Sequence, residues 1–290
     1  MDEPRIKHYI FTRFYNTYAC NAMPKEDFLS IFHLRKKLEM FKSFAYPSLL
    51  SQSNQNYVVL LMVHDDIPQV IYDEMSLLVK DDDNIRLIKN SEIDSRLNDK
   101  VYLLSSSLTK YISDDINTNQ YDYLITSRFD YDDMLYNDAV QDIQTSITED
   151  TLIKYFGFKN GCTLDYNKNE LFKFNKKSDV GLISIGLSMI VNLNVYNKLS
   201  FNVYWGHHSK MRDEFIDKKL PEINEVYELS DEYLNSTDFW EAKETKFPAW
   251  VYVRHNESKS AYLGRFERKL HYSENPIKDE VIKKYFFNHY

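Results

Sequence analysis

Three carboxylates stand close together in the stretch TSRFDYDDML, residues 126–135. Asp130, Asp132 and Asp133 follow the apolar run YDYLIT, which is typical of a buried strand. Like charges crowded at the end of a buried strand repel one another and favour a positive partner. Carboxylates one residue apart can converge on Mg²⁺ or Mn²⁺, hard cations that keep waters and take phosphate oxygens as further ligands.

A metal held in this way would bridge the phosphates of a nucleotide and neutralise charge on a departing diphosphate. Arg128 stands two residues before Asp130, and Arg13 lies at the end of the first predicted strand. Either guanidinium could pair with a carboxylate or reach a phosphate. The competing interpretation is a solvated turn, because Asp is common in loops.

A second acidic pair, Asp65 and Asp66 in HDDIP, follows another apolar run. One interpretation is an N-cap pair before the helix that begins near Pro68, stabilised by the positive helix end. The other is contact with the base or ribose of a nucleotide. The sequence leaves both open.

The first half of the chain alternates between strand and helix patterns. Predicted strands are IKHYIFTRF (6–14), YVVLLMV (57–63), NIRLI (84–88) and YDYLIT (121–126). Predicted helices cover 25–52, 71–81 and 101–112, and Pro47 divides the first of these into two helices or into a helix and its extension. This alternation indicates a mostly parallel sheet with right-handed crossovers. Ligands bind beyond the carboxyl ends of such strands, so both acidic clusters should reach one edge.

The second half is less regular. The apolar segment 180–191 is about a dozen residues long, whereas a membrane-spanning helix needs about twenty, so we predict a buried core element. Near the C-terminus, Asn275 and Pro276 suit the cap and first position of a helix.

Composition excludes several classes. The chain has 290 residues, 43% of them hydrophobic, which is enough for a sizeable hydrophobic core. Its net charge of −8 argues against a basic surface for binding nucleic acid. Two cysteines, Cys20 and Cys162, need no disulfide framework and suit a reducing compartment. The N-terminus lacks a signal-peptide layout, so we expect a soluble, cytoplasmic protein. The sequence leaves its oligomeric state open.

Four motifs occur in an order that resembles the rhamnosyltransferase family of bacterial and viral glycosyltransferases: FTRF, YPSLLSQSNQNYVVLLMVHDD, LITSRFDYDDML and FPAWVYVRHNESKS. The second is also similar to the entry segment of family-2-like glycosyltransferase-A enzymes. The resemblance implies an α/β glycosyltransferase-A fold, with a Rossmann-like, mostly parallel central sheet flanked by helices and a C-terminal acceptor-side extension. Residues 1–145 would bind the nucleotide sugar and residues 146–290 the acceptor, within one continuous domain.

The resemblance also implies site residues and a Mn²⁺ or Mg²⁺ cofactor held by the D-x-D element. Asp130 would face the ribose or the metal, Asp132 the metal, and Asp133 the donor sugar. A late histidine completes many such metal sites, and His255 is our candidate, with His207 second. The predicted nucleotide contacts are Thr12, Arg13, Asp65, Asp66, Arg128 and Asp130.

An inverting transferase needs a carboxylate base to deprotonate the acceptor hydroxyl. Asp213 and Glu214 in KMRDEF are eligible by position, as are Asp238 and Glu241 in STDFWE, and Asp179 is a further possibility. Nothing in the sequence selects among them. The aromatic residues Tyr204, Trp205, Trp250 and Tyr252 could be platforms for an acceptor sugar or members of the core.

These features predict a metal-dependent glycosyltransferase of polysaccharide biosynthesis. It would move rhamnose or another hexose from a nucleoside diphosphate to a hydroxyl of a glycan or glycolipid. Two rivals stay open: a metal-dependent phosphohydrolase or nucleotidyltransferase using the same acidic edge, and a non-catalytic carbohydrate-binding protein on the same fold.

Overall fold

The computed structural model describes residues 3–14, 25–98, 103–174, 185–196, 202–204 and 229–255, and the backbone of 272–277. A seven-stranded sheet forms its centre, in the order β10-β6-β9-β4-β1-β2-β3. The strands are β1 (Ile6–Arg13), β2 (Val58–Val63), β3 (Ile85–Lys89), β4 (Tyr123–Asp130), β6 (Ile153–Phe158), β9 (Ser188–Asn192) and β10 (Trp240–Lys243).

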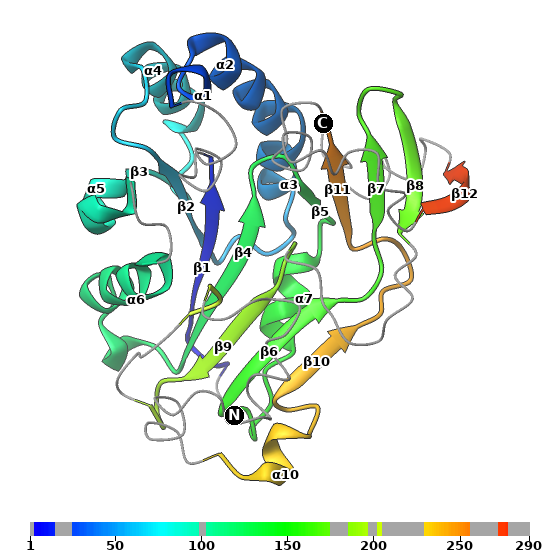
Figure 1. The fold of residues 1–290 in the computed structure, drawn as a ribbon. Coiled ribbons are helices and arrows are strands. Elements are labelled where there is room, and N and C mark those ends of the chain that lie inside the picture. The colour runs from blue at the N-terminus through cyan, green and yellow to red at the C-terminus, as the bar shows by residue number, and fades with distance from the viewer. Residues whose placement is uncertain are drawn as a thin grey trace.

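The sheet is mostly parallel, as the alternating pattern predicted. Strand β1 pairs in parallel with both β2 and β4, β2 with β3, and β6 with β10, whereas β9 runs antiparallel between β4 and β6. Strands β1, β2 and β4 are buried along most of their length, without strict alternation, because helices cover both of their faces (Figure 1). Strands from both halves of the chain thus belong to one sheet.

Helices cover the two faces of the sheet. They are α2 (Ile31–Met40), α3 (Tyr46–Leu50), α4 (Gln69–Val79), α5 (Asn90–Asp94), α6 (Leu104–Asp115) and α7 (Ala139–Thr145). Helix α6 packs with Tyr9 and Phe11 of β1, while α2, α4 and α7 pack on the other face with Ile10. Alternate side chains of one strand therefore enter two separate cores.

The helical segment that begins at Ile31 does not break at Pro47. A π-helical turn, Phe41–Ala45, joins α2 to α3, and the N–H of Tyr46 donates to the carbonyl of Phe41. The wider turn lies just before Pro47, which has no N–H for an α-helical hydrogen bond. Of the two interpretations of Pro47, a division into two helices or a helix with an extension, the structure shows the second, since α2, the π-helical turn and α3 form one continuous segment.

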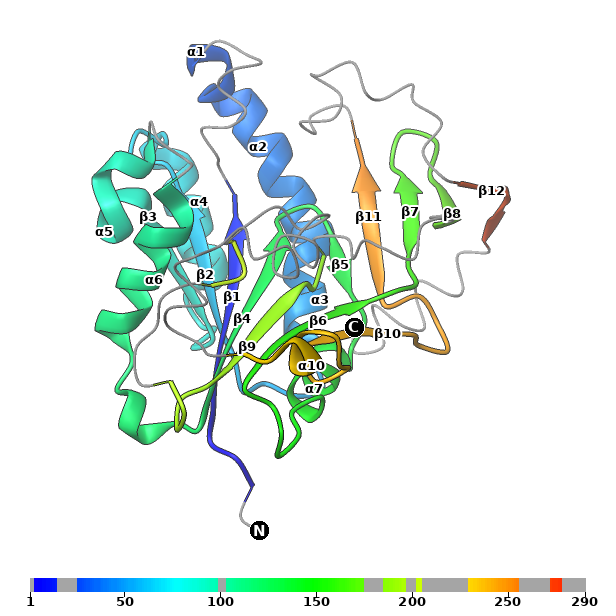
Figure 2. The same ribbon diagram turned by 60° about the horizontal axis from the view of Figure 1, so that its bottom comes forward.

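A second sheet stands beside the first, in the order β12-β8-β7-β11-β5. Figures 1 and 2 show β11, β7 and β8 next to one another, on the side of the central sheet away from α5 and α6. Its strands are β5 (Met134–Leu135), β7 (Cys162–Asp165), β8 (Glu170–Phe174), β11 (Trp250–Arg254) and β12 (Tyr272–Ile277).

Two expectations from the sequence, a helix beginning at Asn275 and a strand ending at Thr126, differ from the structure. Asn275 and Pro276 lie within β12, paired with β8, and not at the start of a helix; β12 is an edge strand, where the missing N–H of proline is tolerated. Strand β4 continues past Thr126 to Asp130, because its parallel ladder with β1 continues to that residue.

The predicted buried element 180–191 is confirmed over its described part, since β9 is buried along its whole length. Within the described ranges, no helix is both long enough and apolar enough to cross a bilayer.

Candidate active site

The carboxyl ends of β1 and β4 place two arginines beside Asp130. In the parallel ladder Arg13 stands opposite Asp130, so both side chains lie on the same face of the sheet, and Arg128 is two residues back along β4. Arg13 Nη2 lies 2.9 Å from Asp130 Oδ1, and Arg128 Nη2 lies 3.8 Å from Asp130 Oδ2. Of the two roles considered for these arginines, pairing with a carboxylate or reaching a phosphate, the structure shows the first.

The acidic turn then brings Asp132 to His255. The N–H of Asp133 donates to the carbonyl of Asp130, after which β5 pairs antiparallel with β11, with Met134 opposite Val251. This short ladder leads β11 past the turn, and His255 Nε2 lies 2.8 Å from Asp132 Oδ2. Both side chains are buried.

Asp133 is buried against the backbone of β11, where its Oδ1 accepts a hydrogen bond from the Val253 N–H at 3.3 Å. Burial first, and then the charges of Asp132 and Asp130, raise the pKa of Asp133 well above its ordinary value. The contact links the acidic turn to β11. The role predicted for Asp133, orienting the donor sugar, stays a prediction.

Tyr204 packs against both arginines, in a role that the sequence did not indicate. Its ring centre lies 5.1 Å from Arg13 Cζ and 5.2 Å from Arg128 Cζ, within cation–π range. Lys37 is a second unpredicted neighbour: this buried lysine of α2 lies 4.4 Å from the ring of Tyr131, between Asp130 and Asp132 in sequence. A lysine on an amphipathic helix ordinarily indicates a solvent-facing position, so no sequence signal identified it.

Asp132 and His255 are suited to a divalent cation. Two ligands about 2.1 Å from Mg²⁺ or Mn²⁺, at adjacent octahedral positions, would stand about 3.0 Å apart, close to the separation of Asp132 Oδ2 and His255 Nε2. Carboxylate oxygen and imidazole nitrogen also suit manganese. Among the residues that the structure describes, no three His, Cys, Asp or Glu side chains gather into a metal-binding group. A cation here would take its remaining ligands from water and phosphate.

The other predicted nucleotide contacts occupy the same edge of the sheet. Asp65, just beyond β2, accepts hydrogen bonds from Ser91 Oγ at 2.5 Å and from the Asn98 amide. Helix α4 is capped at Pro68 without a side-chain bond, so the alternative N-cap interpretation of Asp65 and Asp66 is wrong. The Asp66 side chain is 57% exposed.

Thr12 is buried on the face of β1 opposite to Arg13. Its Oγ1 makes no hydrogen bond within the described part of the chain. A contact between Thr12 and a nucleotide stays a prediction.

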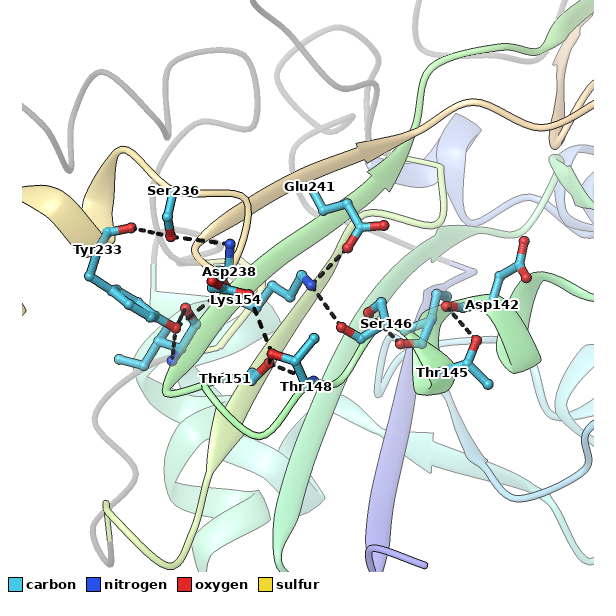
Figure 3. A network of polar contacts seen from close by, with 12 residues as sticks. Asp142, Thr145, Ser146, Thr148, Thr151, Lys154, Tyr233, Ser236, Asp238 and Glu241 are labelled. Carbon is cyan, nitrogen blue, oxygen red and sulfur yellow. Dashed lines mark hydrogen bonds and ion pairs between the residues drawn. The ribbon is translucent and has the colours of Figure 1, made fainter.

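Two of the candidate bases have other partners in the central sheet: Asp238 lies just before β10 and Glu241 lies within it. Strand β6 runs in the direction of β4, and β10 runs with β6, so Asp238 precedes β10 at the amino edge. Figure 3 shows Asp238 near Thr148, which donates to it at 3.3 Å, and Glu241 at 2.7 Å from Lys154 Nζ. Residues Asp179, Trp205, His207, Asp213 and Glu214 lie outside the described residues.

Trp250 belongs to the core and is no platform for a sugar. Its side chain is fully buried, its indole N–H donates to the Phe158 carbonyl at 3.3 Å, and Phe174 packs edge-on at 5.0 Å. Tyr252 is half-buried.

A mostly parallel sheet flanked by helices, with an acidic turn at its carboxyl edge, makes the chain an α/β protein, as the sequence predicted. Residues 31–212 match the family model described as "Putative rhamnosyl transferase". The match covers more than half of the chain, which therefore belongs to this family of transferases. It includes Arg128 and the acidic turn and excludes Arg13 and His255.

Among curated proteins, no sequence matches the chain significantly. Solved structures give remote likenesses. The inositol-1-phosphate CTP transferase from T. maritima is 10% identical at a TM-score of 0.40, over 93% of this chain and 99% of its own. Mouse xyloside xylosyltransferase 1 is 8% identical at a TM-score of 0.37, over 83% of this chain and 86% of its own. S. aureus TarS is 8% identical at 0.37, over 87% of this chain and 37% of its own. Such scores support no argument about substrate or mechanism.

Proposed function

We propose that this protein is a metal-dependent glycosyltransferase. It transfers a hexose, with rhamnose the first candidate, from a nucleoside diphosphate to a hydroxyl of a glycan or glycolipid. The observation that carries the proposal is the pairing of Asp132 with His255, residues 123 positions apart in the chain, beside two arginines at the edge where α/β sheets bind ligands. Membership of the rhamnosyl transferase family supports the reaction class.

In this proposal Asp132 and His255 hold Mn²⁺ or Mg²⁺. When bound, the cation supplies Lewis-acid neutralisation of the charge that builds on the departing diphosphate. Asp133 holds the acidic turn against β11, so that Asp132 keeps its position. Arg13 and Arg128 supply positive charge at the same edge, and Asp65 and Asp66 are the candidates for contact with the nucleoside.

Sugar transfer also requires that the acceptor hydroxyl lose its proton, and a carboxylate is the usual base. Asp238 precedes β10 and contacts Thr148, and Glu241 within β10 pairs with Lys154, so neither is our candidate for this step. Asp213 and Glu214 remain the candidates. Inversion of the anomeric centre is likewise part of the proposal and follows the family expectation.

The test is a panel of nucleotide sugars with free acceptors and Mn²⁺, read by mass spectrometry of the glycosylated product. Asp132→Asn and His255→Gln should each lower transfer by at least about a hundredfold, because each removes a metal ligand. The matched control is Asp81→Asn, which changes the same charge at a side chain that is 88% exposed. Wild-type rates in Asp132→Asn would contradict the metal role.

The same panel separates the rival functions. Cleavage at phosphorus, which releases a nucleoside monophosphate and a sugar phosphate, or inorganic phosphate, without any glycosylated product, indicates a phosphohydrolase. A transferase that uses water in place of the acceptor would instead release the nucleoside diphosphate and free sugar. Glycan binding that is indifferent to chelator and to Asp132→Asn identifies a non-catalytic binding protein.

A further inference from the structure

Two positive side chains and one negative side chain meet at the carboxyl ends of β1 and β4. Arg13 and Arg128 both face Asp130, at 2.9 Å and 3.8 Å, and the side chains of the three are only 18%, 19% and 27% exposed. Two guanidinium groups thus share one close carboxylate. Arginine stays charged in proteins, so the one carboxylate within 4 Å balances only one of the two guanidinium charges, and Asp132 and Asp133 act on them from farther along the acidic turn.

The two guanidinium groups are also short of hydrogen-bond acceptors. Each has five N–H donors, and the Nε of both Arg13 and Arg128 is buried without a partner within the described part of the chain. The ring of Tyr204 lies against both groups in cation–π contact, which attracts their charges but supplies no acceptor for either buried Nε. Burial, and then the neighbouring charge of Arg13, lower the pKa of Arg128. For Arg13 the effect of burial is outweighed by Tyr204 and Asp130, which raise its pKa.

An anion with several oxygens would correct both deficits. Guanidinium forks match phosphate oxygens in pairs, and a diphosphate brings more negative charge than one carboxylate. Asp130 is the last residue of β4, directly before the acidic turn, and its carboxylate stands where such an anion would contact both arginines.

We propose that Arg13 and Arg128 form a seat for the diphosphate of the donor, and that Asp130 is their resident counter-ion, displaced by the diphosphate and not a ligand of the metal. The identity of the anion rests on the proposed function. The different roles of the two carboxylates, Asp130 as counter-ion and Asp132 as metal ligand, are inferred from geometry, since Asp130 contacts the arginines while Asp132 contacts His255. Asp130 is therefore a positioning residue that keeps the two cations together before the donor arrives.

The test is calorimetric binding of inorganic pyrophosphate in the presence of EDTA, which removes any contribution from a divalent cation. Asp130→Asn should bind pyrophosphate about tenfold more tightly than the wild type, because the ligand no longer competes with a carboxylate. Arg13→Gln and Arg128→Gln should each bind at least about tenfold more weakly. Asp81→Asn and Arg35→Gln, which change exposed charges elsewhere, should match the wild type.

Weaker or unchanged pyrophosphate binding by Asp130→Asn would overturn the inference, since a metal ligand has no reason to compete with an anion in EDTA. If Asp130→Asn does not fold, Arg128→Gln keeps the question open to test, because it leaves the 2.9 Å contact between Arg13 and Asp130 in place. Wild-type pyrophosphate affinity in Arg128→Gln would then refute the seat.

The outcome is separable from that of the proposed function. The expected pyrophosphate pattern without any sugar transfer would leave the seat standing and remove the glycosyltransferase proposal. Metal-dependent sugar transfer with no effect of the arginine variants on pyrophosphate binding would do the reverse.

Discussion

Acidification should destabilise this protein through one histidine in the middle of the central sheet. His8 of β1 is 1% exposed, and burial lowers its pKa to about 3. Gln144 Nε2 lies 3.3 Å from His8 Nδ1, and an amide nitrogen only donates, so Nδ1 accepts and the proton of the neutral ring sits on Nε2. Nε2–H then donates to Ser127 Oγ at 2.7 Å.

A second proton on the His8 ring would be placed on Nδ1, where it would face the N–H donor of the Gln144 amide. The Gln144 amide cannot turn its oxygen toward His8 without cost, because its nitrogen also donates to the Asn56 carbonyl at 2.7 Å and its oxygen accepts from Asn54 at 3.0 Å. On the other side, Ser127 Oγ lies 2.5 Å from Ser188 Oγ. The folded ring therefore stays neutral while the unfolded ring titrates near its ordinary pKa of 6.5.

The sign and size follow from linkage. Because the folded pKa is the lower one, the unfolded state binds the extra proton, and stability is complete above the unfolded pKa and lost as the pH falls toward the folded one. At pH 5, which is about 1.5 below the unfolded pKa, His8 should lower the free energy of unfolding by about 2 kcal/mol relative to pH 8.

The assay is urea unfolding of the wild type and of His8→Gln at pH 8 and pH 5. Other groups also titrate over this range, but they are common to both proteins, so the difference between the two unfolding free energies isolates His8. That difference should shift by about 2 kcal/mol in disfavour of the wild type at pH 5. An equal difference at both pH values, or an imidazolium signal of His8 in the folded protein at pH 5, would refute the reasoning.

Two further predictions concern packing and a buried ion pair. Gly161→Ala should lower the free energy of unfolding by about 3 kcal/mol, because a Cβ at this position would lie 2.1 Å from the Trp250 ring; wild-type melting would show that the ring can move. Lys154→Met should cost about 2 kcal/mol, since Lys154 Nζ contacts both Glu241 and the Ser146 carbonyl at 2.7 Å (Figure 3). The double variant Lys154→Met with Glu241→Met should recover most of that loss in urea unfolding, and a strictly additive loss would contradict the pairing.

The central sheet was predictable because each of its first strands has a recognisable apolar pattern within its own few residues. Runs such as YVVLLMV can be buried on both faces only in a covered, mostly parallel sheet, and the helices between them carry the matching apolar spacing. Strand β4 was predicted too short, since Ser127 and Arg128 look polar in sequence. Pairing with β1, and the buried bonds of Ser127 to His8 and Ser188, extend the strand through them.

The partners of the acidic turn were less predictable, because each depends on a contact between distant segments. Strand β5 is only two residues long, yet its ladder with β11 is what brings His255 to Asp132. Tyr204 was grouped with aromatic platforms, and nothing in its neighbourhood in sequence indicates that it would cover two arginines. The burial of Lys37 beside Tyr131 likewise depends on tertiary packing between distant segments, which the sequence does not indicate.

The spacing of Asp130 and Asp132 suggested that both would converge on one cation, since residues i and i+2 of a strand share a face. That inference holds only while the strand continues. Strand β4 ends at Asp130, and the hydrogen bond from the Asp133 N–H to the Asp130 carbonyl turns the chain. Asp130 therefore keeps the strand's face and contacts Arg13, while Asp132 is directed to β11 and contacts His255. One short acidic motif can thus serve an anion seat and a cation site side by side, because the strand ends between its two carboxylates.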